Sequence, residues 1–187
     1  MPHLQTERLR LEPLTAHHAA AFLAFVERNR AHLARWEPER GDEFYTLAYH
    51  QAEIARSEAN AERGTEARFI AFDSASSEIV ASVNLWNIRR GAIQAATIGY
   101  SVDAAREGRG YATECARAVV RYAFDELNLH RVETSYQPLN ERSGRVLRKL
   151  GFVVEGYARD HLLIAGTWRD GILVALTNET WRPALAR

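Results

Sequence analysis

The sequence of 187 residues has a single cysteine, a single lysine and no net charge. The lone Cys115 cannot form an internal disulfide and excludes a cysteine-rich metal site. The 24 basic and 24 acidic residues balance, whereas a general nucleic-acid binder carries a basic excess. No segment approaches the ~18 consecutive apolar residues of a membrane span, and residues 1–25 lack the pattern of a secretory signal. These absences predict a cytoplasmic protein that binds neither nucleic acid nor membranes.

The chain also lacks a linker rich in proline, glycine or serine and any repeat of fixed period, so we expect one domain over residues 1–187. Its seven histidines are scattered without the spacing of metal ligands, which predicts that no metal is bound. Because Lys149 is the only lysine, nearly every cation is an arginine. Arginine binds phosphate and carboxylate through two parallel hydrogen bonds. A balanced total charge can therefore accompany a local anion site.

Hydropathy periodicity predicts a domain that mixes strands and helices. Alternating apolar residues indicate strands, and apolar residues three and four positions apart indicate helices. The predicted strands lie near residues 9–13, 69–72, 79–85, 98–102, 131–137, 152–154 and 171–176. The predicted helices include one over residues 112–124 and one that ends at Leu150, where Gly151 suits a left-handed cap. This order predicts an α+β fold with at least one β-loop-α-β unit.

The turn between the strand at 98–102 and the following helix has the features of an anion site. Backbone N–H groups in the first turn of a helix have no acceptor within the helix, and the helix dipole favours negative charge there. Gly108 and Gly110 would let a phosphate approach the backbone closely. Arg106 and Arg109 flank the turn and could add charged contacts. A tight turn without a ligand is the alternative, since two glycines alone are weak evidence.

A dinucleotide-binding domain is a second nucleotide-type interpretation of this turn. That motif places a third glycine where this chain has Thr113, although Glu133 lies roughly where a ribose-binding acid could fall. It also requires further βα repeats on a parallel sheet. The strand pairs before residue 98 and after residue 152 are predicted to be hairpins instead, which disfavours this interpretation.

Several segments resemble the GNAT N-acetyltransferases, in particular their RimJ/RimL-like branch, in the order in which that branch carries them. The turn Glu107-Gly108-Arg109-Gly110-Tyr111-Ala112 resembles the acyl-CoA loop, Gln/Arg-x-x-Gly-x-Gly/Ala. The other segments are the opening at residues 6–11, His130-Arg131-Val132-Glu133, the stretches 140–143 and 149–156, and the tail at 166–170. The resemblance spans nearly the whole chain.

This resemblance implies a layered α/β/α arrangement, the GNAT acyl-CoA N-acyltransferase fold. Its mixed, mostly antiparallel sheet would carry helices on both faces, and acetyl-CoA would lie in a V-shaped opening between two parallel central strands. The resemblance also assigns cofactor-binding positions. Backbone amides of the turn would hold the pyrophosphate, the strand would hold the pantetheine arm, and Asn140 would hydrogen-bond the pantetheine or cap a helix. These positions are Tyr100, Ser101, Val102, Gly108, Arg109, Gly110, Tyr111, Ala112, Thr113 and Asn140.

The resemblance implies direct attack of an amine on the thioester, followed by protonation of the departing thiolate. A serine at the position of Ser143 is the suggested proton donor in this branch, and helix capping is its alternative role. Glu133 is the best remaining carboxylate for a base, acting through water, and a salt-bridged strand residue is its alternative. An amide of the strand could polarise the thioester carbonyl.

Three positions depart from the family pattern. Glu107 replaces the Gln or Arg that opens the loop, and we expect Arg106 or Arg109 to offset its charge. Leu147 stands where many members carry a proton-donating tyrosine. A glutamate proposed as a base in one RimL-type protein would fall near Leu162.

The acceptor half of the cleft is expected to include Trp36, Asn84 and Trp86, although such aromatics are often core or dimer contacts. A homodimer therefore remains an open alternative. The resemblance predicts transfer of an acetyl group to a protein N-terminal α-amine of the ribosomal-protein type. Two alternatives stay open: acetylation of a small-molecule amine, and a non-catalytic acyl-CoA-binding module.

Overall fold

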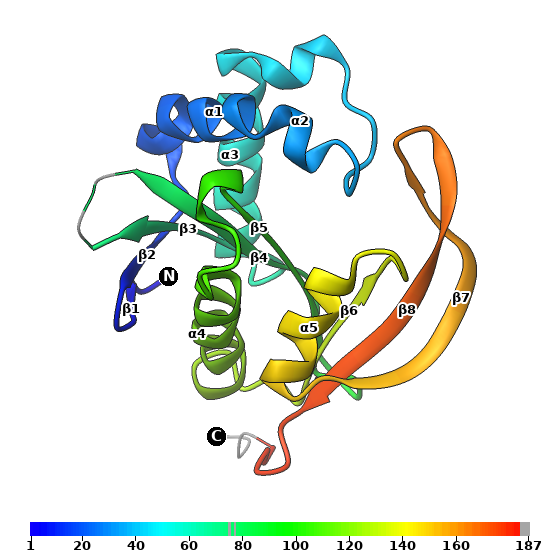
Figure 1. Cartoon of the computed structure of the whole chain (residues 1–187). Helices are drawn as coiled ribbons and strands as arrows, with labels where there is room; N and C mark the ends of the chain where they lie inside the picture. Colours follow the sequence, from blue (N-terminus) through cyan, green and yellow to red (C-terminus); the bar gives the residue numbers. More distant parts are fainter. Residues whose placement is uncertain (75, 77, 184–187) are drawn as a thin grey trace.

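A computed structural model of the chain describes residues 1–74, 76 and 78–183. In this part of the chain, eight strands form one sheet in the order β1-β2-β3-β4-β5-β6-β8-β7 (Figure 1). The strands are β1 (Leu4–Gln5), β2 (Leu9–Pro13), β3 (Ala67–Asp73), β4 (Ile79–Arg89), β5 (Ala95–Val102), β6 (Arg131–Tyr136), β7 (Val153–Ile164) and β8 (Thr167–Thr177). The α-helices are α1 (Ala19–Arg28), α2 (Arg30–Leu33), α3 (Leu47–Glu62), α4 (Tyr111–Asp125) and α5 (Glu141–Leu150). Short 3₁₀ turns are η1 (Ala16–His18), η2 (Asp42–Tyr45) and η3 (Ala104–Arg106).

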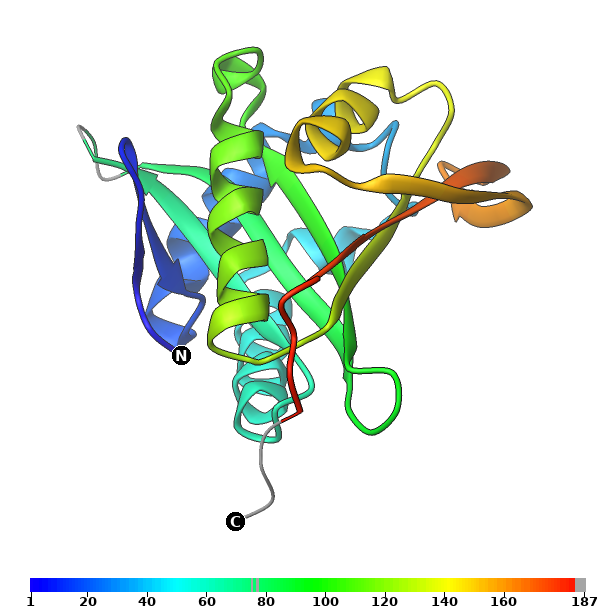
Figure 2. The same ribbon diagram turned by 90° about the horizontal axis from the view of Figure 1, so that it is seen from below.

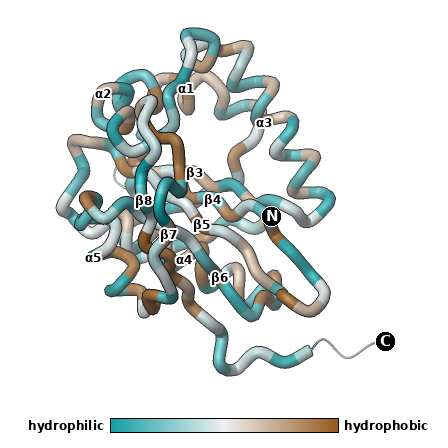
Figure 3. The backbone as a smooth tube through the Cα atoms, turned by 90° about the vertical axis from the view of Figure 1, so that its right-hand side faces the viewer, coloured by the Kyte–Doolittle hydropathy of each residue, from teal (hydrophilic) through white to brown (hydrophobic). Residues whose placement is uncertain are grey.

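Helices cover both faces of the sheet, as the resemblance predicts. Successive side chains of a strand point to opposite faces. Along β3, Phe69 packs in the core beneath α4, whereas Ile70 and Phe72 pack in the core beneath α1 and α3. Seen from below, α4 lies on the near face of the sheet, with α1 and α3 behind it (Figure 2). Hydrophobic and hydrophilic stretches alternate along α1 and α3, as expected of helices with one buried face (Figure 3).

The sheet is mixed and mostly antiparallel, which confirms the predicted architecture. Among the described strands, only β5 and β6 run parallel, and they pair through three residues each, from Ala95 with Arg131 to Thr97 with Glu133. Beyond that point β5 stays paired with β4 as far as Val102, and β6 stays paired with β8 as far as Tyr136. The two parallel strands therefore separate and leave a V-shaped opening in the middle of the sheet.

The predicted elements agree with the observed ones where periodicity was strong. Strand β2 ends at Pro13, α4 begins one residue before the predicted helix, and α5 ends at Gly151, which has a φ of 93°. The hairpin β7–β8 is much longer than the short strands predicted near residues 152–154 and 171–176. Most of β7 is exposed on both faces, so it lacks the alternation on which the prediction depended.

None of the described helices combines the length and the hydropathy of a membrane span. The predicted single domain covers residues 1–187, of which residues 75, 77 and 184–187 lie outside the described part.

Candidate active site

The opening between β5 and β6 leads into a cleft of about 1610 Å³. One half of the cleft is bounded by the end of β5, the turn before α4 and the start of α5. The other half is bounded by α1, α3, β4 and the segment after α2. A ligand that passes through the sheet here would meet backbone amides on one side and polar and aromatic side chains on the other.

The turn before α4 has the geometry of an anion site. Gly108 and Gly110 have φ angles of 73° and 85°, a region in which a residue with a Cβ atom is strained. Gly110 is the N-cap of α4, so the amides of Tyr111, Ala112 and Thr113 lie in its first turn. These amides have no acceptor within the helix and carry the positive end of its dipole. Gly108, Gly110 and all three first-turn residues line the cleft.

The N-terminal segment holds this turn in place, which gives the opening motif at residues 6–11 a structural role. Glu114, in the first turn of α4, accepts hydrogen bonds from the Thr6 hydroxyl at 2.6 Å and from the Arg8 backbone amide at 3.0 Å. The Arg8 guanidinium pairs with the same carboxylate and donates to the Arg109 carbonyl at 2.9 Å. It also lies over the Tyr111 ring, whose hydroxyl donates to Asp73 at 2.7 Å. Thr6, Arg8 and Glu114 thus form a clamp that holds the predicted phosphate turn at Arg109 and at the first turn of α4.

Glu107 is neutralised by residues other than those predicted. Its carboxylate accepts a hydrogen bond from Arg142 in α5 and lies 3.3 Å from His32 Nε2. Arg106 instead pairs with Asp73 and Glu78. The expectation that Arg106 or Arg109 offsets Glu107 is therefore wrong, because the fold brings Arg142 to the turn from the other side of the cleft.

Ser143 and Tyr100 form a hydrogen-bonded pair at the edge of the cleft. Their hydroxyl oxygens are 3.0 Å apart, and the phenol also donates to the Ser143 carbonyl at 3.3 Å. Burial raises the pKa of Tyr100 to about 12, although the bond to Ser143 acts in the opposite direction. The phenol therefore stays protonated at neutral pH. The Asn140 side-chain oxygen accepts from the Ser143 amide at 3.1 Å, so the alternative role of Asn140 as an N-cap is confirmed.

Glu133 forms ion pairs with Arg89 and Arg131. It accepts hydrogen bonds from Arg131 Nε at 2.8 Å and from the Arg89 guanidinium. Burial raises its pKa, but these bonds outweigh burial and hold the pKa below its ordinary value. Glu133 is also missing from the residues that line the described cleft, whereas its neighbours Thr134 and Ser135 line it. The structure thus argues against Glu133 as a base, because two arginines already neutralise a carboxylate that does not face the ligand.

The predicted acceptor residues lie together in the other half of the cleft. Trp36, Asn84 and Trp86 all line it, and Trp86 is 41% exposed. The Trp86 ring lies so close to Gly99 that a Cβ atom there would stand 2.6 Å from two of its carbons. A glycine at position 99 in β5 is therefore required for this tryptophan to cover the opening.

The structure adds two cleft residues that the sequence did not single out. Glu37 is half-buried, and burial raises its pKa against a weaker opposing effect of Arg40. His50 is 3% exposed, and its Nε2 atom has no partner among the described residues. Burial, followed by the charge of Arg68, lowers the pKa of His50, against an opposing hydrogen bond to the Phe44 backbone. Because Nε2 has no partner in the described part of the chain, Nδ1 is the nitrogen that donates to Phe44, and Nε2 of the neutral ring is an acceptor. The neighbouring Trp36, which was expected in the acceptor half, is the sequence signal that could have pointed to Glu37, whereas no sequence signal pointed to His50.

The predicted cofactor positions mostly line the cleft. They are Tyr100, Ser101, Val102, Gly108, Gly110, Tyr111, Ala112, Thr113 and Asn140. Arg109 is outside the lining found among the described residues, since it faces the clamp with its carbonyl bound to Arg8. Cys115 is fully buried, and burial raises the pKa of its thiol to about 12, in agreement with an inert core residue.

Comparisons with known proteins agree with this geometry. Residues 8–153 match the family model of the acetyltransferase (GNAT) domain. The chain is 36% identical over 180 residues to the ribosomal protein uS5-alanine N-acetyltransferase of Escherichia coli (strain K12), covering 96% of this chain and 93% of that protein.

Solved structures give the same result. The ribosomal-protein-S5-alanine acetyltransferase of Vibrio fischeri superposes with a TM-score of 0.94 and 31% identity, covering 98% of this chain and 100% of that one. Mycobacterium smegmatis RimJ in complex with CoA-disulfide superposes with a TM-score of 0.88 and 30% identity, covering 95% and 87%. The similarity thus includes both halves of the cleft.

Proposed function

The chain belongs to the GNAT acetyltransferase family, and from this premise we propose that it transfers an acetyl group from acetyl-CoA to a protein N-terminal α-amine of the ribosomal-protein type. The observation that carries the proposal is the opening between β5 and β6, which ends at the amide-lined turn before α4. The identity with a uS5-alanine N-acetyltransferase over nearly the full chain supports the choice of acceptor. An acceptor of this type would place the enzyme in the cytoplasm.

We propose one orientation of acetyl-CoA in the cleft. The amides of Gly108 to Thr113 would receive the pyrophosphate, because the helix dipole and the missing acceptors favour an anion there. The pantetheine arm would follow the edge of β5 at Tyr100–Val102, which β6 leaves unpaired. The CoA-bound relative supports this cofactor. The thioester would then lie between the two diverging strands, near Ser143.

The proposed reaction is direct attack by a neutral amine. The amine nitrogen bonds to the thioester carbon, and a β5 amide would stabilise the negative charge that develops on the carbonyl oxygen. When the C–S bond breaks, the thiolate takes a proton from the Ser143 hydroxyl. Tyr100 supports this step, because its protonated phenol lies 3.0 Å from the Ser143 oxygen and can restore that proton. The tyrosine that many relatives carry at position 147 is thus replaced by a serine–tyrosine pair.

Glu37 replaces Glu133 as the proposed base. A carboxylate whose pKa is raised toward neutrality accepts a proton more effectively than one that is held ionised by arginines. Glu37 lines the acceptor half of the cleft together with Trp36, whereas Glu133 is bound by Arg89 and Arg131. Acting directly or through water, Glu37 would take the proton that the attacking amine loses. The free Nε2 atom of His50 offers an acceptor for an N–H or O–H group of the peptide in the same half.

A homodimer is also proposed, through the outer edge of the sheet. Strand β7 is the last strand of the described sheet, and it exposes Val153 by 66% and Tyr157 by 58%. Unpaired edge strands with apolar side chains favour pairing with another chain. A second copy aligned along β7 would cover them.

A thiol-release assay tests the proposed function. The untagged enzyme is incubated with acetyl-CoA and either alanine-initiated N-terminal peptides or small amines such as polyamines and amino acids. We expect CoA release with the peptides and little with the small amines. Turnover with a small amine alone would show that the acceptor is a small molecule and not a protein N-terminus. CoA binding without turnover on any acceptor would favour the non-catalytic acyl-CoA-binding module.

A further inference from the structure

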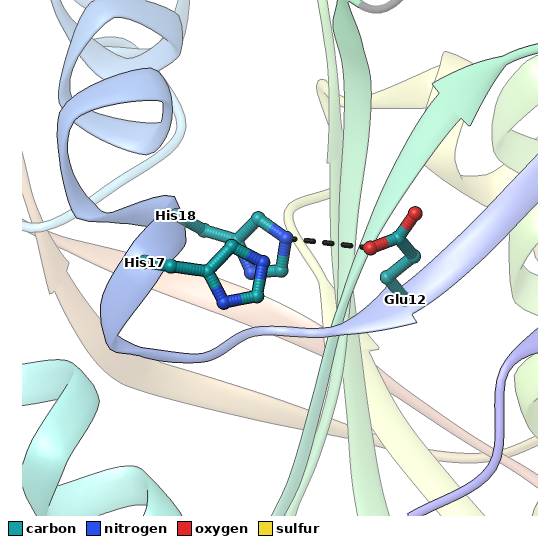
Figure 4. A group of neighbouring side chains, drawn as sticks. All are labelled: Glu12, His17 and His18. Carbon is teal, nitrogen blue, oxygen red and sulfur yellow. Dashed lines mark ion pairs between the residues drawn. The ribbon is translucent and has the colours of Figure 1, made fainter.

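Three potential metal ligands meet at the junction of β2 and α1, away from the active site. Glu12 lies near the end of β2, and His17 and His18 form the end of η1. One ligand atom from each residue lies within 4.8 Å of the other two. Figure 4 shows the two imidazole rings side by side, with a ring nitrogen of each directed toward the Glu12 carboxylate. No metal was predicted from the spacing of the histidines, because that spacing does not show how the turn at Pro13–Thr15 brings Glu12 to His17 and His18.

The far side of each ligand is already held by a neighbour. Nδ1 of His17 and Nδ1 of His18 lie 2.7 and 3.1 Å from the Thr15 hydroxyl oxygen. One oxygen of Glu12 accepts from Arg10 Nε at 2.6 Å. The atoms that remain are Nε2 of each histidine and the second carboxylate oxygen. Metal-binding histidines are usually oriented in this way, by a hydrogen bond to the ring nitrogen that does not bind the ion.

The separation of His18 Nε2 from the Glu12 carboxylate leaves room for an ion. His18 Nε2 is 3.4 Å from Glu12 Oε2, whereas a charge-assisted hydrogen bond is about 2.7–2.9 Å long. Two ligands at about 2.0–2.1 Å from a tetrahedral zinc ion lie roughly 3.3 Å apart.

The competing interpretation is a helix cap without metal. The Thr15 amide donates to His18 Nδ1 at 3.2 Å, as in a capping box, and in that tautomer His18 Nε2 carries a proton directed at Glu12. That arrangement uses His18 and Glu12 but gives no role to His17 Nε2, for which no hydrogen bond is found among the described residues. Metal binding requires the other tautomer of His18, in which Nδ1–H donates to the Thr15 hydroxyl.

We propose that Glu12, His17 and His18 bind a divalent transition-metal ion of the zinc class, with water in the remaining coordination positions. Imidazole and carboxylate ligands suit this class. None of the three residues belongs to the described cleft lining, whereas Phe22, Phe25 and Val26 of α1 do. The ion would therefore tie the end of β2 to the start of α1 and stabilise the acceptor wall without taking part in acetyl transfer.

Isothermal titration of the untagged full-length chain with zinc chloride, after removal of metal by a chelator, tests the proposal. We expect a single ion per chain. His17→Ala and Glu12→Gln should each weaken zinc binding at least about tenfold, because each removes one of the three protein ligands. Thr15→Val should weaken it by about 10- to 100-fold through loss of ligand orientation. His130→Ala, which removes an exposed histidine remote from the cluster, should leave binding unchanged.

Thermal melting provides the second readout. Zinc should raise the melting temperature of the wild-type chain and leave that of His17→Ala unchanged, since a ligand that binds only the folded state stabilises it. His17 is exposed, so its replacement is not expected to unfold the chain. Absence of zinc binding by the wild type, or binding that survives both His17→Ala and Glu12→Gln, would overturn the proposal. Neither readout depends on acetyl transfer, so its failure is separate from failure of the proposed function.

Discussion

The pairing of Ser143 with Tyr100 gives a weak acid a second proton source. A serine hydroxyl donates a proton poorly, so its usefulness depends on placement. Here the Asn140 cap orients the first turn of α5, and the buried phenol of Tyr100 lies within hydrogen-bonding distance of the serine oxygen. Under the proposed mechanism, two residues on different elements would share the protonation of the thiolate.

Removal of either hydroxyl should slow the chemical step. Ser143→Ala should lower kcat by about 10²-fold, near the lower end of the effect of a general acid. Tyr100→Phe should lower kcat less, because water can replace a second proton source. The KM for acetyl-CoA should change little in both variants. Steady-state kinetics with a peptide acceptor measures these values, and an unchanged kcat in both variants would contradict the assignment.

Glu37 should determine the acidic limb of the pH profile. Its pKa is raised by burial, and a base must be deprotonated to act. The wild-type kcat should therefore fall as the pH falls through a value above the ordinary pKa of glutamate, about 4.3. Glu37→Gln should lower kcat by about 10²-fold and abolish that limb. Glu133→Gln is the matched control and should keep the limb; if it removes the limb instead, the two roles are reversed.

The opening between β5 and β6 depends on how β4 and β5 pack beside it. The separation of the two parallel strands after Thr97 and Glu133 exposes the edge of β5, and Trp86 of β4 covers Gly99 on the acceptor side. Strand β5 would therefore both offer its free edge to the cofactor and position the Trp86 ring in the acceptor half of the cleft.

A methyl group at position 99 should disturb this contact. In Gly99→Ala the new Cβ would stand 2.6 Å from the Trp86 ring, so the ring must move. We expect a loss of about 1–3 kcal/mol in the free energy of unfolding, as for other overpacked sites, measured by urea titration. Combination with Trp86→Ala should recover part of that loss, because residues in contact are not additive. Full additivity would show that the ring and position 99 do not interact.

The clamp formed by Thr6, Arg8 and Glu114 should control cofactor affinity. Glu114→Gln removes the charge that holds Arg8, and with it the contact to the Arg109 carbonyl. We expect the KM for acetyl-CoA to rise about tenfold, or about 1.4 kcal/mol, the range of a hydrogen bond to a charged group. Asp42→Asn removes an exposed ion pair with Arg30 outside the described cleft lining and should have no such effect. Equal KM values for the two variants would contradict the clamp.

Much of the chain's architecture followed from its sequence, because hydropathy periodicity and glycine positions report on buried elements. Strand β2, helix α4, Gly151 and the phosphate turn were predicted within a residue or two. The hairpin β7–β8 was predicted too short, since its exposed residues carry no periodic signal.

The side-chain partners were harder to predict, because they come from distant segments. Glu107 pairs with Arg142, 35 residues later in the sequence. Glu133 pairs with Arg89, 44 residues earlier, and with the nearby Arg131. No local pattern shows that Arg89 reaches Glu133 or that Thr6 reaches Glu114. The same limit hid the cluster of Glu12 with His17 and His18.

The balanced charge of the chain is reflected in ion pairs around the cleft. Arginines near the cleft are occupied by carboxylates, as with Arg106, Arg142 and Arg8. The predicted phosphate site therefore depends on backbone amides and the dipole of α4 more than on free cations. A protein without net charge can hold a polyanionic cofactor in this way.

Mass spectrometry of the product tests the central claim most directly. The enzyme is incubated with acetyl-CoA and an alanine-initiated peptide that also contains a lysine, and the acetylated atom is located by fragmentation. The account predicts one acetyl group on the α-nitrogen, no reaction when that nitrogen is blocked beforehand, and much less product with Ser143→Ala. Acetylation of the lysine alone, or no product although CoA binds, would contradict it.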